Sequence, residues 1–339
     1  MHESCADASP NVKGRKMKPD EKPLVSIGIP TYNRASSYLP QALKCAVGQS
    51  YSNIEIIVAD NCSTDNTEEV VVGFKDARIR YFKHQQNIGP NNNFNFAWQQ
   101  ASGAYFQLLH DDDLIDPDFV QACMARAAYR TDIGLIRTGI RLVHGDLSLK
   151  AELKNQLFGP TTDDFIFSWF ADMTPPYLCG TLFNRKGLED IGGFKSRHNL
   201  FQDVLAEFKL AHRMGKVDIE EPKASFREHA GEITVNVKIK GWSEDSLELL
   251  DLLCAIASDK NRERVRTEGR KFFARKMYEM LQKSARAHGR RRPSMVDYLK
   301  VYRIFGFRYL PPPVHRRLYA LYRWTGARQV YHKLSGNPS

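Results

Sequence analysis

The chain has 339 residues, of which 42% are hydrophobic and 26% are charged, and its formal net charge is +10. This composition is ordinary for a soluble globular protein and allows one large domain or two small ones. It argues against a membrane-spanning protein, because no apolar run approaches the ~18–20 residues of a membrane span. The six cysteines include no Cys-x-x-Cys pair, so we expect no zinc site, and a reducing cytoplasm suits them best.

The N-terminal half predicts an α/β fold behind a polar lead-in. Residues 1–22 are polar without a signal-peptide pattern, so we expect them to be disordered. The expected strands are 24–29, 54–59, 79–82, 105–109 and 134–138, and the expected helices are 37–49, 64–74, 93–101 and 117–129. Alternating helices and continuous apolar strands predict a Rossmann-like, mostly parallel sheet with helices on both faces.

The pattern loosens after about residue 145. A strand is expected at 178–183 and a helix at 202–214, and from Ser243 the chain has helical character almost to its end. We therefore expect three parts, which are the lead-in at 1–22, the α/β domain at 23–240 and a basic, aromatic-rich helical region at 241–339.

Three consecutive carboxylates, Asp111, Asp112 and Asp113, follow the strand at 105–109. Like charges at a strand end need a counter-charge, and Mg²⁺ and Mn²⁺ prefer carboxylate oxygens. Open α/β sheets bind ligands at the carboxyl ends of their strands. The run predicts a site for a metal and a phosphate group. The alternative is a solvated acidic run in which Asp113 caps the next helix.

The loop after the first strand is a candidate nucleotide contact. It reads Pro30-Thr31-Tyr32-Asn33-Arg34 and faces the ligand crevice of a doubly wound sheet. Tyr32 offers a ring that stacks on a base, and Arg34 pairs well with phosphate. The alternative is an ordinary connection between a strand and a helix.

Two further loops carry candidate residues. Asp60 ends the second strand, where its carboxylate can accept from a uracil-type N–H or a ribose hydroxyl, whereas Asp65 reads as structural. Asn87 and Gly89 precede the third helix, and Gly89 permits a positive φ or close approach of the backbone to a nucleotide.

The ordered set of segments resembles the nucleotide-sugar-binding half of glycosyltransferase family 2, over about residues 23–235. The segments are Pro30-Thr31-Tyr32-Asn33-Arg34, Asp60-Asn61-Cys62-Ser63-Thr64-Asp65, Asn87-Ile88-Gly89, Gly103-Ala104-Tyr105, His110-Asp111-Asp112-Asp113 and Pro117-Asp118-Phe119. The resemblance implies a GT-A fold, a nucleoside-diphosphate-sugar donor, a Mn²⁺ or Mg²⁺ ion and inversion at the anomeric carbon.

The resemblance also implies roles for the acidic run. Asp111 would contact the ribose, Asp112 would hold the metal that bridges the diphosphate, and Asp113 would support it or be a further ligand. His110 departs from the pattern, because many relatives have Asp at this position.

Two later segments also resemble the family. The Gly-Gly-Phe run at 192–194 leads to Gln202-Asp203, where relatives carry the catalytic base, often in a Glu-Asp pair. Only Asp203 of this pair is a carboxylate, so it is the expected base, and a helix N-cap is the alternative. In the Arg-x-His segment, Arg227 would neutralise phosphate, and His229 would ligate the metal or contact the diphosphate.

Positive charge is concentrated near the C-terminus. Residues 260–333 contain 21 Lys and Arg against 4 Asp and Glu, interleaved with aromatic residues. Such a sequence suits an anionic membrane surface, and a helical cap or a dimer surface is the alternative. We expect no nucleic-acid partner, since no nucleic-acid-binding motif accompanies the charge.

These features predict an inverting glycosyltransferase whose acceptor is a saccharide or a lipid-linked intermediate of a surface polysaccharide. We expect a cytoplasmic protein, either free or peripheral on the inner face of the plasma membrane. A nucleotidyltransferase is an alternative, although it usually has a Gly-rich basic loop after the first strand. A non-catalytic nucleotide-sugar-binding protein is the other alternative.

Overall fold

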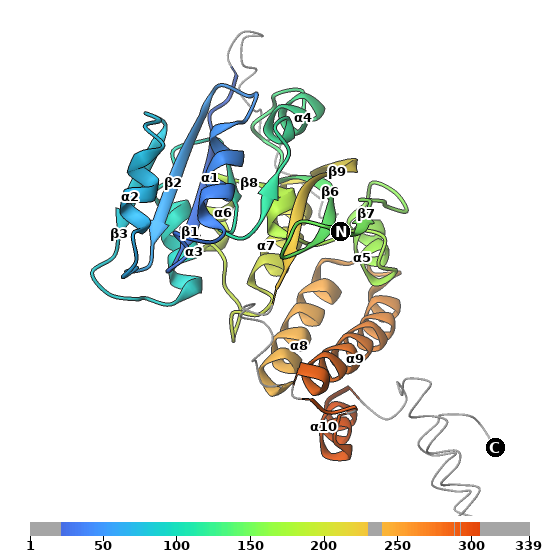
Figure 1. Ribbon diagram of the computed structural model, residues 1–339. Helices are drawn as coiled ribbons and strands as arrows, with labels where there is room; N and C mark the ends of the chain where they lie inside the picture. Colours follow the sequence, from blue (N-terminus) through green and yellow to red (C-terminus); the bar gives the residue numbers. More distant parts are fainter. Residues whose placement is uncertain (1–21, 230–238, 288, 292, 306–339) are drawn as a thin grey trace, which may run out of the picture.

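The computed structural model describes residues 22–229, 239–287, 289–291 and 293–305 (Figure 1). The lead-in predicted at 1–22 lies outside these residues except for Lys22, and so does the part of the basic C-terminal region from residue 306 onward.

A nine-stranded sheet organises the described part of the chain. Its strands are β1 (Val25–Thr31), β2 (Ile54–Asp60), β3 (Ile79–Lys83), β4 (Tyr105–Leu108), β5 (Leu114–Ile115), β6 (Leu135–His144), β7 (Leu149–Leu153), β8 (Thr181–Asn184) and β9 (Lys216–Glu228). They pair in the order β3-β2-β1-β4-β8-β6-β9-β5, with β7 on β6. Neighbouring strands from β3 to β4 are parallel, whereas β8 is antiparallel to both its neighbours and β6 and β9 are again parallel.

Ten α-helices and one short 3₁₀ helix complete the described part of the chain. They are α1 (Leu39–Val47), α2 (Thr67–Gly73), α3 (Pro90–Gln99), α4 (Phe119–Arg126), α5 (Thr162–Phe170), η1 (Leu178–Gly180), α6 (Arg185–Ile191), α7 (Gln202–Met214), α8 (Ile239–Ile256), α9 (Arg262–Ala287) and α10 (Met295–Phe305).

Both faces of the sheet are covered, and β2 shows why its sequence is continuously apolar. Ile56 and Val58 belong to a core that includes α1, α2 and α4. Ile57 and Ala59 belong to a second core that includes α3 and the helices from α5 onward. Successive side chains of a strand point to opposite faces of the sheet. A strand that is buried on both faces therefore shows no alternation of polar and apolar residues.

Several predicted strand boundaries differ from the structure, and the strand expected at 134–138 continues to His144 as β6. The first strand continues through Pro30, which pairs with Ala59 of β2. It does so because β4 has already ended at Leu108, opposite Gly28, so no ladder is interrupted on that side of Pro30. The strand expected at 178–183 forms only at Thr181–Asn184, since η1 takes its first residues.

The helices after residue 239 pack on the face of the sheet that carries α5 and α7 (Figure 1). Aromatic rings pack α9 against α5. The centre of the Phe272 ring, on α9, lies 4.7 Å from that of Trp169 and 5.1 Å from that of Phe170, both on α5. None of the described helices is both long enough and apolar enough to span a membrane.

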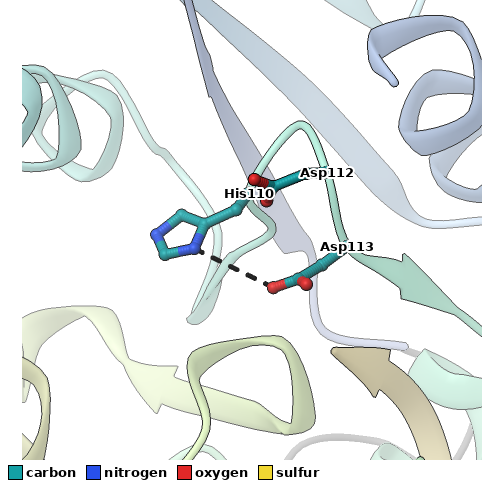
Figure 2. A group of neighbouring side chains, drawn as sticks. All are labelled: His110, Asp112 and Asp113. Carbon is teal, nitrogen blue, oxygen red and sulfur yellow. Dashed lines mark ion pairs between the residues drawn. The ribbon is translucent and has the colours of Figure 1, made fainter. Parts of the chain in front are cut away.

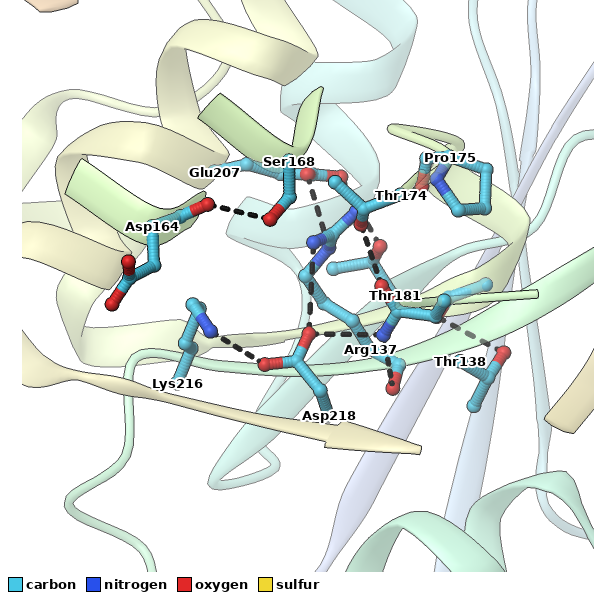
Figure 3. A network of polar contacts seen from close by, with 12 residues as sticks. Arg137, Thr138, Asp164, Ser168, Thr174, Pro175, Thr181, Glu207, Lys216 and Asp218 are labelled. Atoms are coloured by element: carbon cyan, nitrogen blue, oxygen red, sulfur yellow. Dashed lines mark hydrogen bonds and ion pairs between the residues drawn. The ribbon is translucent and has the colours of Figure 1, made fainter. Parts of the chain in front are cut away.

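A buried group of charges holds α7 against the sheet (Figure 3). The guanidinium of Arg137, on β6, lies 3.2 Å from Glu207 of α7 and 3.6 Å from Asp218 of β9. It also lies 4.5 Å from the ring centre of Phe165, and it donates a hydrogen bond of 2.8 Å to the carbonyl of Pro175. Burial raises the pKa of Glu207 to about 7, against the attraction of Arg137.

We expect Arg137→Met to lower the free energy of unfolding by about 3 kcal/mol, because it leaves two carboxylates without their shared cation. Urea denaturation measures the change. Arg130→Met is the control, since Arg130 forms a largely exposed pair with Asp132 and should change stability by less than about 1 kcal/mol. Equal losses in the two variants would contradict a stabilising role for the buried group.

Candidate functional site

The three carboxylates lie in a tight turn between β4 and β5, at the carboxyl end of the parallel half of the sheet. Figure 2 shows Asp112 and Asp113 of this turn together with His110. The N–H of Asp113 closes the turn on the carbonyl of His110 at 3.1 Å. Asp111 is buried and accepts a 2.6 Å hydrogen bond from the hydroxyl of Thr31. Asp113 does not cap the next helix, because Asp118 occupies the N-cap of α4.

His110, Asp112 and Asp113 form the candidate metal group. Each offers one ligand atom, and these atoms lie within 4.8 Å of one another. Nδ1 of His110 is 3.8 Å from Asp113 Oδ2, and its Nε2 is buried without a hydrogen-bond partner. Two carboxylates suit Mn²⁺ or Mg²⁺, and an imidazole is a common ligand of transition metals. These donors fit the ion that the family implies.

Electrostatics at the turn favour a counter-charge. Burial, with the charge of Asp112 as the next cause, raises the pKa of Asp111 to about 7. The same two causes raise the pKa of Asp113 well above its usual range. Buried carboxylates of like charge stay ionised together only when a cation compensates them, and otherwise at least one of them takes up a proton. The turn is therefore built to receive positive charge.

The end of β9 brings two basic residues to the acidic turn. The N–H of Arg227 donates to Asp113 at 3.1 Å, and Nε2 of His229 lies 2.9 Å from Asp112 Oδ2. The guanidinium of Arg227 is buried and donates to Gln41 at 2.8 Å. Within the described residues, His229 therefore contacts the candidate metal group through Asp112, and Arg227 contacts it through its backbone.

Tyr38 lies at the centre of this basic side of the site. Its ring centre is 4.5 Å from the guanidinium of Arg227, 5.4 Å from that of Arg34 and 4.8 Å from the ring of His229. Cations held over a tyrosine ring are attracted by its π-electrons. Tyr38 was not among the residues predicted from the sequence, although its place just before α1 and after the loop at 30–34 could have indicated it.

The loop after β1 presents its residues in different ways. Pro30 and Thr31 belong to the buried strand end, whereas the Tyr32 side chain is 45% exposed. Asn33 has a φ of 53°, and its N–H donates to the hydroxyl of Ser63 at 2.9 Å. Asn33 therefore links this loop to the loop after β2 and leaves the Tyr32 ring open to a ligand.

Asp60, expected to contact a base or ribose, is fully buried at the end of β2. Its Oδ1 accepts from the N–H of Ser63 at 2.8 Å, and its Oδ2 accepts from the hydroxyl of Tyr81 at 2.6 Å. Asp65 is structural as expected, since it accepts from the N–H of Ala35 at 3.0 Å. One oxygen of Asp60 thus holds the loop after β2 and the other holds Tyr81 of β3, which the sequence pattern did not indicate.

The loop before α3 is closed by side-chain amides. Asn87 Oδ1 accepts from the side chain of Asn61 at 2.9 Å and from the N–H of Gly89 at 2.9 Å. Gly89 has a φ of 82°, as its conformational freedom predicted, and an added Cβ would meet no atom within 4 Å. The loop is therefore held through Asn87 and open at Gly89.

Asp203 lies in the first turn of α7. Phe201 is the N-cap, so the N-cap alternative for Asp203 is wrong. Burial raises the pKa of Asp203 to about 6, and the N–H of Val204 donates to it at 2.8 Å. No side chain among the described residues forms a hydrogen bond with Asp203, which leaves its carboxylate available to a substrate.

Comparisons with known sequences point to one family. Residues 26–192 match the family model for Glycosyl transferase family 2. An uncharacterized glycosyltransferase of Rickettsia felis is 42% identical over 101 residues, which are 29% of this chain and 16% of that protein. The GalNAc(5)-diNAcBac-PP-undecaprenol beta-1,3-glucosyltransferase of Campylobacter jejuni is 38% identical over 108 residues, which are 31% of this chain and 35% of that protein. The matches thus span about a third or less of these relatives.

Solved structures share the fold over most of the chain. S. aureus TarS in complex with UDP-GlcNAc aligns with a TM-score of 0.60 at 15% identity, over 92% of this chain and 90% of that chain. The mannosyltransferase PcManGT from Pyrobaculum calidifontis, in complex with GDP-Man and Mn²⁺, aligns with a TM-score of 0.50 at 18% identity. The alignment covers 94% of this chain and 85% of that chain. The α/β fold predicted from the sequence, of the GT-A type, is thereby confirmed. The segment 26–192, just under half of the chain, therefore belongs to glycosyltransferase family 2.

Proposed function

We propose that the protein is an inverting glycosyltransferase that moves a sugar from a nucleoside-diphosphate-sugar to a hydroxyl acceptor. The observation that carries this proposal is the acidic turn after β4, where His110, Asp112 and Asp113 converge within 4.8 Å. The match of residues 26–192 to the family model supports it, and two solved structures of this fold hold UDP-GlcNAc and GDP-Man.

The donor nucleotide would lie over the loops at the carboxyl ends of β1, β2 and β4. Tyr32 would stack on the base, because its ring is exposed. Asp111 would accept from the ribose while the hydroxyl of Thr31 holds it in place. Asn33, Asn87 and Gly89 would line the same surface, with Pro30 and Asp60 buried beneath it.

The basic side of the site would face the diphosphate. Arg34 is partly exposed beside Tyr38, so its guanidinium is the one we expect at the phosphates. Arg227 is buried and would act from behind Tyr38, through its charge. This places positive groups where the leaving group gains charge.

The acidic turn would hold Mn²⁺ or Mg²⁺ through Asp112 and Asp113, with His110 as a third donor. When bound, such an ion supplies positive charge that stabilises a diphosphate leaving group. His229 would be a further ligand or would orient Asp112, which it contacts at 2.9 Å.

Asp203 would be the general base. The acceptor oxygen attacks the anomeric carbon as its proton passes to the Asp203 carboxylate. The bond from that carbon to the diphosphate breaks, and its electron pair leaves on the diphosphate. A carboxylate with a pKa of about 6 is ionised at pH 7 and is a stronger base than an ordinary Asp.

We infer that the acceptor is a saccharide, most simply one carried on a lipid. The relative from Campylobacter jejuni is named for an undecaprenol-linked acceptor. Helix α9 and the residues after it also expose basic side chains that form no ion pair among the described residues. These are Lys271, Lys283, Arg286, Arg290, Arg291 and Arg303. Attachment through them would place the protein at the inner face of the plasma membrane.

Loss of one carboxylate should remove the metal. We expect Asp112→Asn to abolish transfer and to weaken Mn²⁺ binding at least about tenfold in the presence of a nucleoside diphosphate. Electron paramagnetic resonance of free Mn²⁺ measures the binding directly. Asp118→Asn is the control, because Asp118 pairs with Lys223 near the surface. Full activity in EDTA, or unchanged Mn²⁺ binding by Asp112→Asn, would refute the metal site.

Loss of the base should slow chemistry and spare donor binding. We expect Asp203→Asn to lower kcat by roughly 10²–10⁴, with the donor Kd nearly unchanged. In the wild type, kcat/KM should rise with pH to a plateau above about 6, because Asp203 must lose its proton first. The Asp203→Asn variant should not show this rise of kcat/KM with pH. Asp190→Asn, on the exposed surface of α6, should still show it. A loss seen wholly as weaker donor binding would show that Asp203 is misassigned.

The basic surface should bind anionic vesicles. Each basic residue near such a surface contributes on the order of 1 kcal/mol, and salt screens the attraction. We expect co-sedimentation with phosphatidylglycerol vesicles at low salt and little at ~0.5 M salt. Replacing Lys283, Arg286, Arg290 and Arg291 with Glu should reduce it and spare donor hydrolysis.

The matched control for this experiment replaces four scattered exposed residues, Lys44, Lys75, Arg126 and Lys186, with Glu. It makes the same change in net charge away from α9. An equal loss of vesicle binding in both variants would show that total charge, and not this surface, governs attachment.

A further inference from the structure

The connection between α6 and α7 leads directly to Asp203. It begins with Gly192 and Gly193, which have φ values of 79° each, and it ends at Phe201, the N-cap of α7. Leu200 lies three residues before Asp203, so the path of this loop decides where the first turn of α7 begins.

The start of the connection is fixed on α3. The N–H of Phe194 donates to the side-chain oxygen of Asn95 at 2.9 Å, and the Asn95 amide donates to the carbonyl of Phe194 at 2.9 Å. A Cβ added to Gly193 would lie 2.4 Å from the same Asn95 oxygen, so only glycine fits there.

The end of the connection is held by one buried carboxylate of α8, Asp245. Its Oδ2 accepts from the hydroxyl of Ser196 at 2.6 Å and from the N–H of Leu200 at 3.0 Å. Its Oδ1 accepts from the N–H of His198 at 2.8 Å. Asp245 is 0% exposed and has no ion pair among the described residues, so these donors are what compensates its charge.

Aromatic packing from the same helices fixes the next residue. The ring of Phe201 is 5.1 Å from Trp242 of α8, nearly perpendicular to it, and 5.9 Å from Phe273 of α9. Edge-to-face pairs of this kind favour one orientation of the rings. The residue that opens α7 is therefore held by the C-terminal helices, not by the sheet alone.

A carboxylate is a costly way to join two buried surfaces. Apolar residues of similar volume often join such surfaces with equal or greater stability. A buried carboxylate imposes a specific geometry, because several hydrogen-bond donors must converge on its two oxygens to compensate its charge. The three donors to Asp245 come from alternate residues of one loop, so they specify the shape of that loop.

We propose that Asp245 is a positioning residue for the transfer reaction. It fixes the loop at 196–200 and, through it, the turn of α7 that presents Asp203 to the acceptor. This inference rests on the proposed function of Asp203. It makes α8 part of the catalytic apparatus, although α8 follows the residues 26–192 that match the family model.

The test compares two full-length variants that each alter a carboxylate anchor. Asp245→Asn keeps the size of the side chain but replaces an acceptor oxygen with a donor that faces the loop. Asp163→Asn is the matched control. Asp163, on α5, also accepts from three groups, namely the N–H of Ser258 at 3.0 Å, its hydroxyl, and the side chain of Asn261 at 2.8 Å. It joins α5 to the turn between α8 and α9, apart from the Asp203 loop.

We expect Asp245→Asn to lower kcat by about 10- to 100-fold, since small misplacements of a catalytic group have effects of this size. Donor KM and nucleoside-diphosphate affinity should stay within about twofold, because the donor loops are not touched. Amide hydrogen exchange should become faster at residues 196–203. Asp163→Asn should leave kcat and that exchange unchanged.

Three results would overturn the proposal. They are a normal kcat in Asp245→Asn, an equal loss in Asp163→Asn, and a loss confined to donor affinity. Should Asp245→Asn not fold, Ser196→Ala removes only one donor and should lower kcat by a smaller factor, with unchanged donor KM. Should the wild type transfer no sugar, the proposed function fails separately, and exchange at 196–203 in the two variants still decides whether Asp245 holds the loop.

Discussion

Negative charge gathered in the turn after β4 is the constraint on which the rest of the site depends. Asp111 and Asp113 are almost fully buried beside Asp112, and burial raises the pKa of both. The surrounding structure compensates them only in part, with the hydroxyl of Thr31 on one side and the N–H of Arg227 on the other. A divalent cation would supply the positive charge that is still missing, and a diphosphate would then bind beside that cation.

The sheet explains how distant segments meet at that turn. Parallel pairing of β1, β2 and β4 aligns their carboxyl ends, so the three loops that follow them lie at one edge. The mixed half of the sheet then adds β9, whose end brings Arg227 and His229 to the acidic turn. The proposed acceptor side is assembled differently, because Arg137 holds α7 from the sheet and Asp245 of α8 holds the loop before α7.

Local patterns in the sequence predicted the parallel strands, α7 and the acidic turn, since continuous apolar runs and helical spacing do not depend on distant contacts. The same patterns did not predict β9, whose thirteen residues mix charged and apolar side chains along a strand between β6 and β5. Asp245 acts through partners far along the chain, so no spacing indicated it, and the contacts of Tyr38 with Arg227 and His229 depend on the return of β9 to the site. His110 stood out only as a departure from the family pattern, and its place near Asp113 emerges from the closed turn.

The central claim is that a metal and a nucleoside diphosphate meet at the acidic turn. Anomalous diffraction from crystals grown with Mn²⁺ and a nucleoside diphosphate tests it most directly. The account predicts one strong manganese peak within coordination distance of Asp112 or Asp113, with the diphosphate beside it and the base near Tyr32. A bound diphosphate at another edge of the sheet, or manganese absent from the turn when the diphosphate is present, would contradict it.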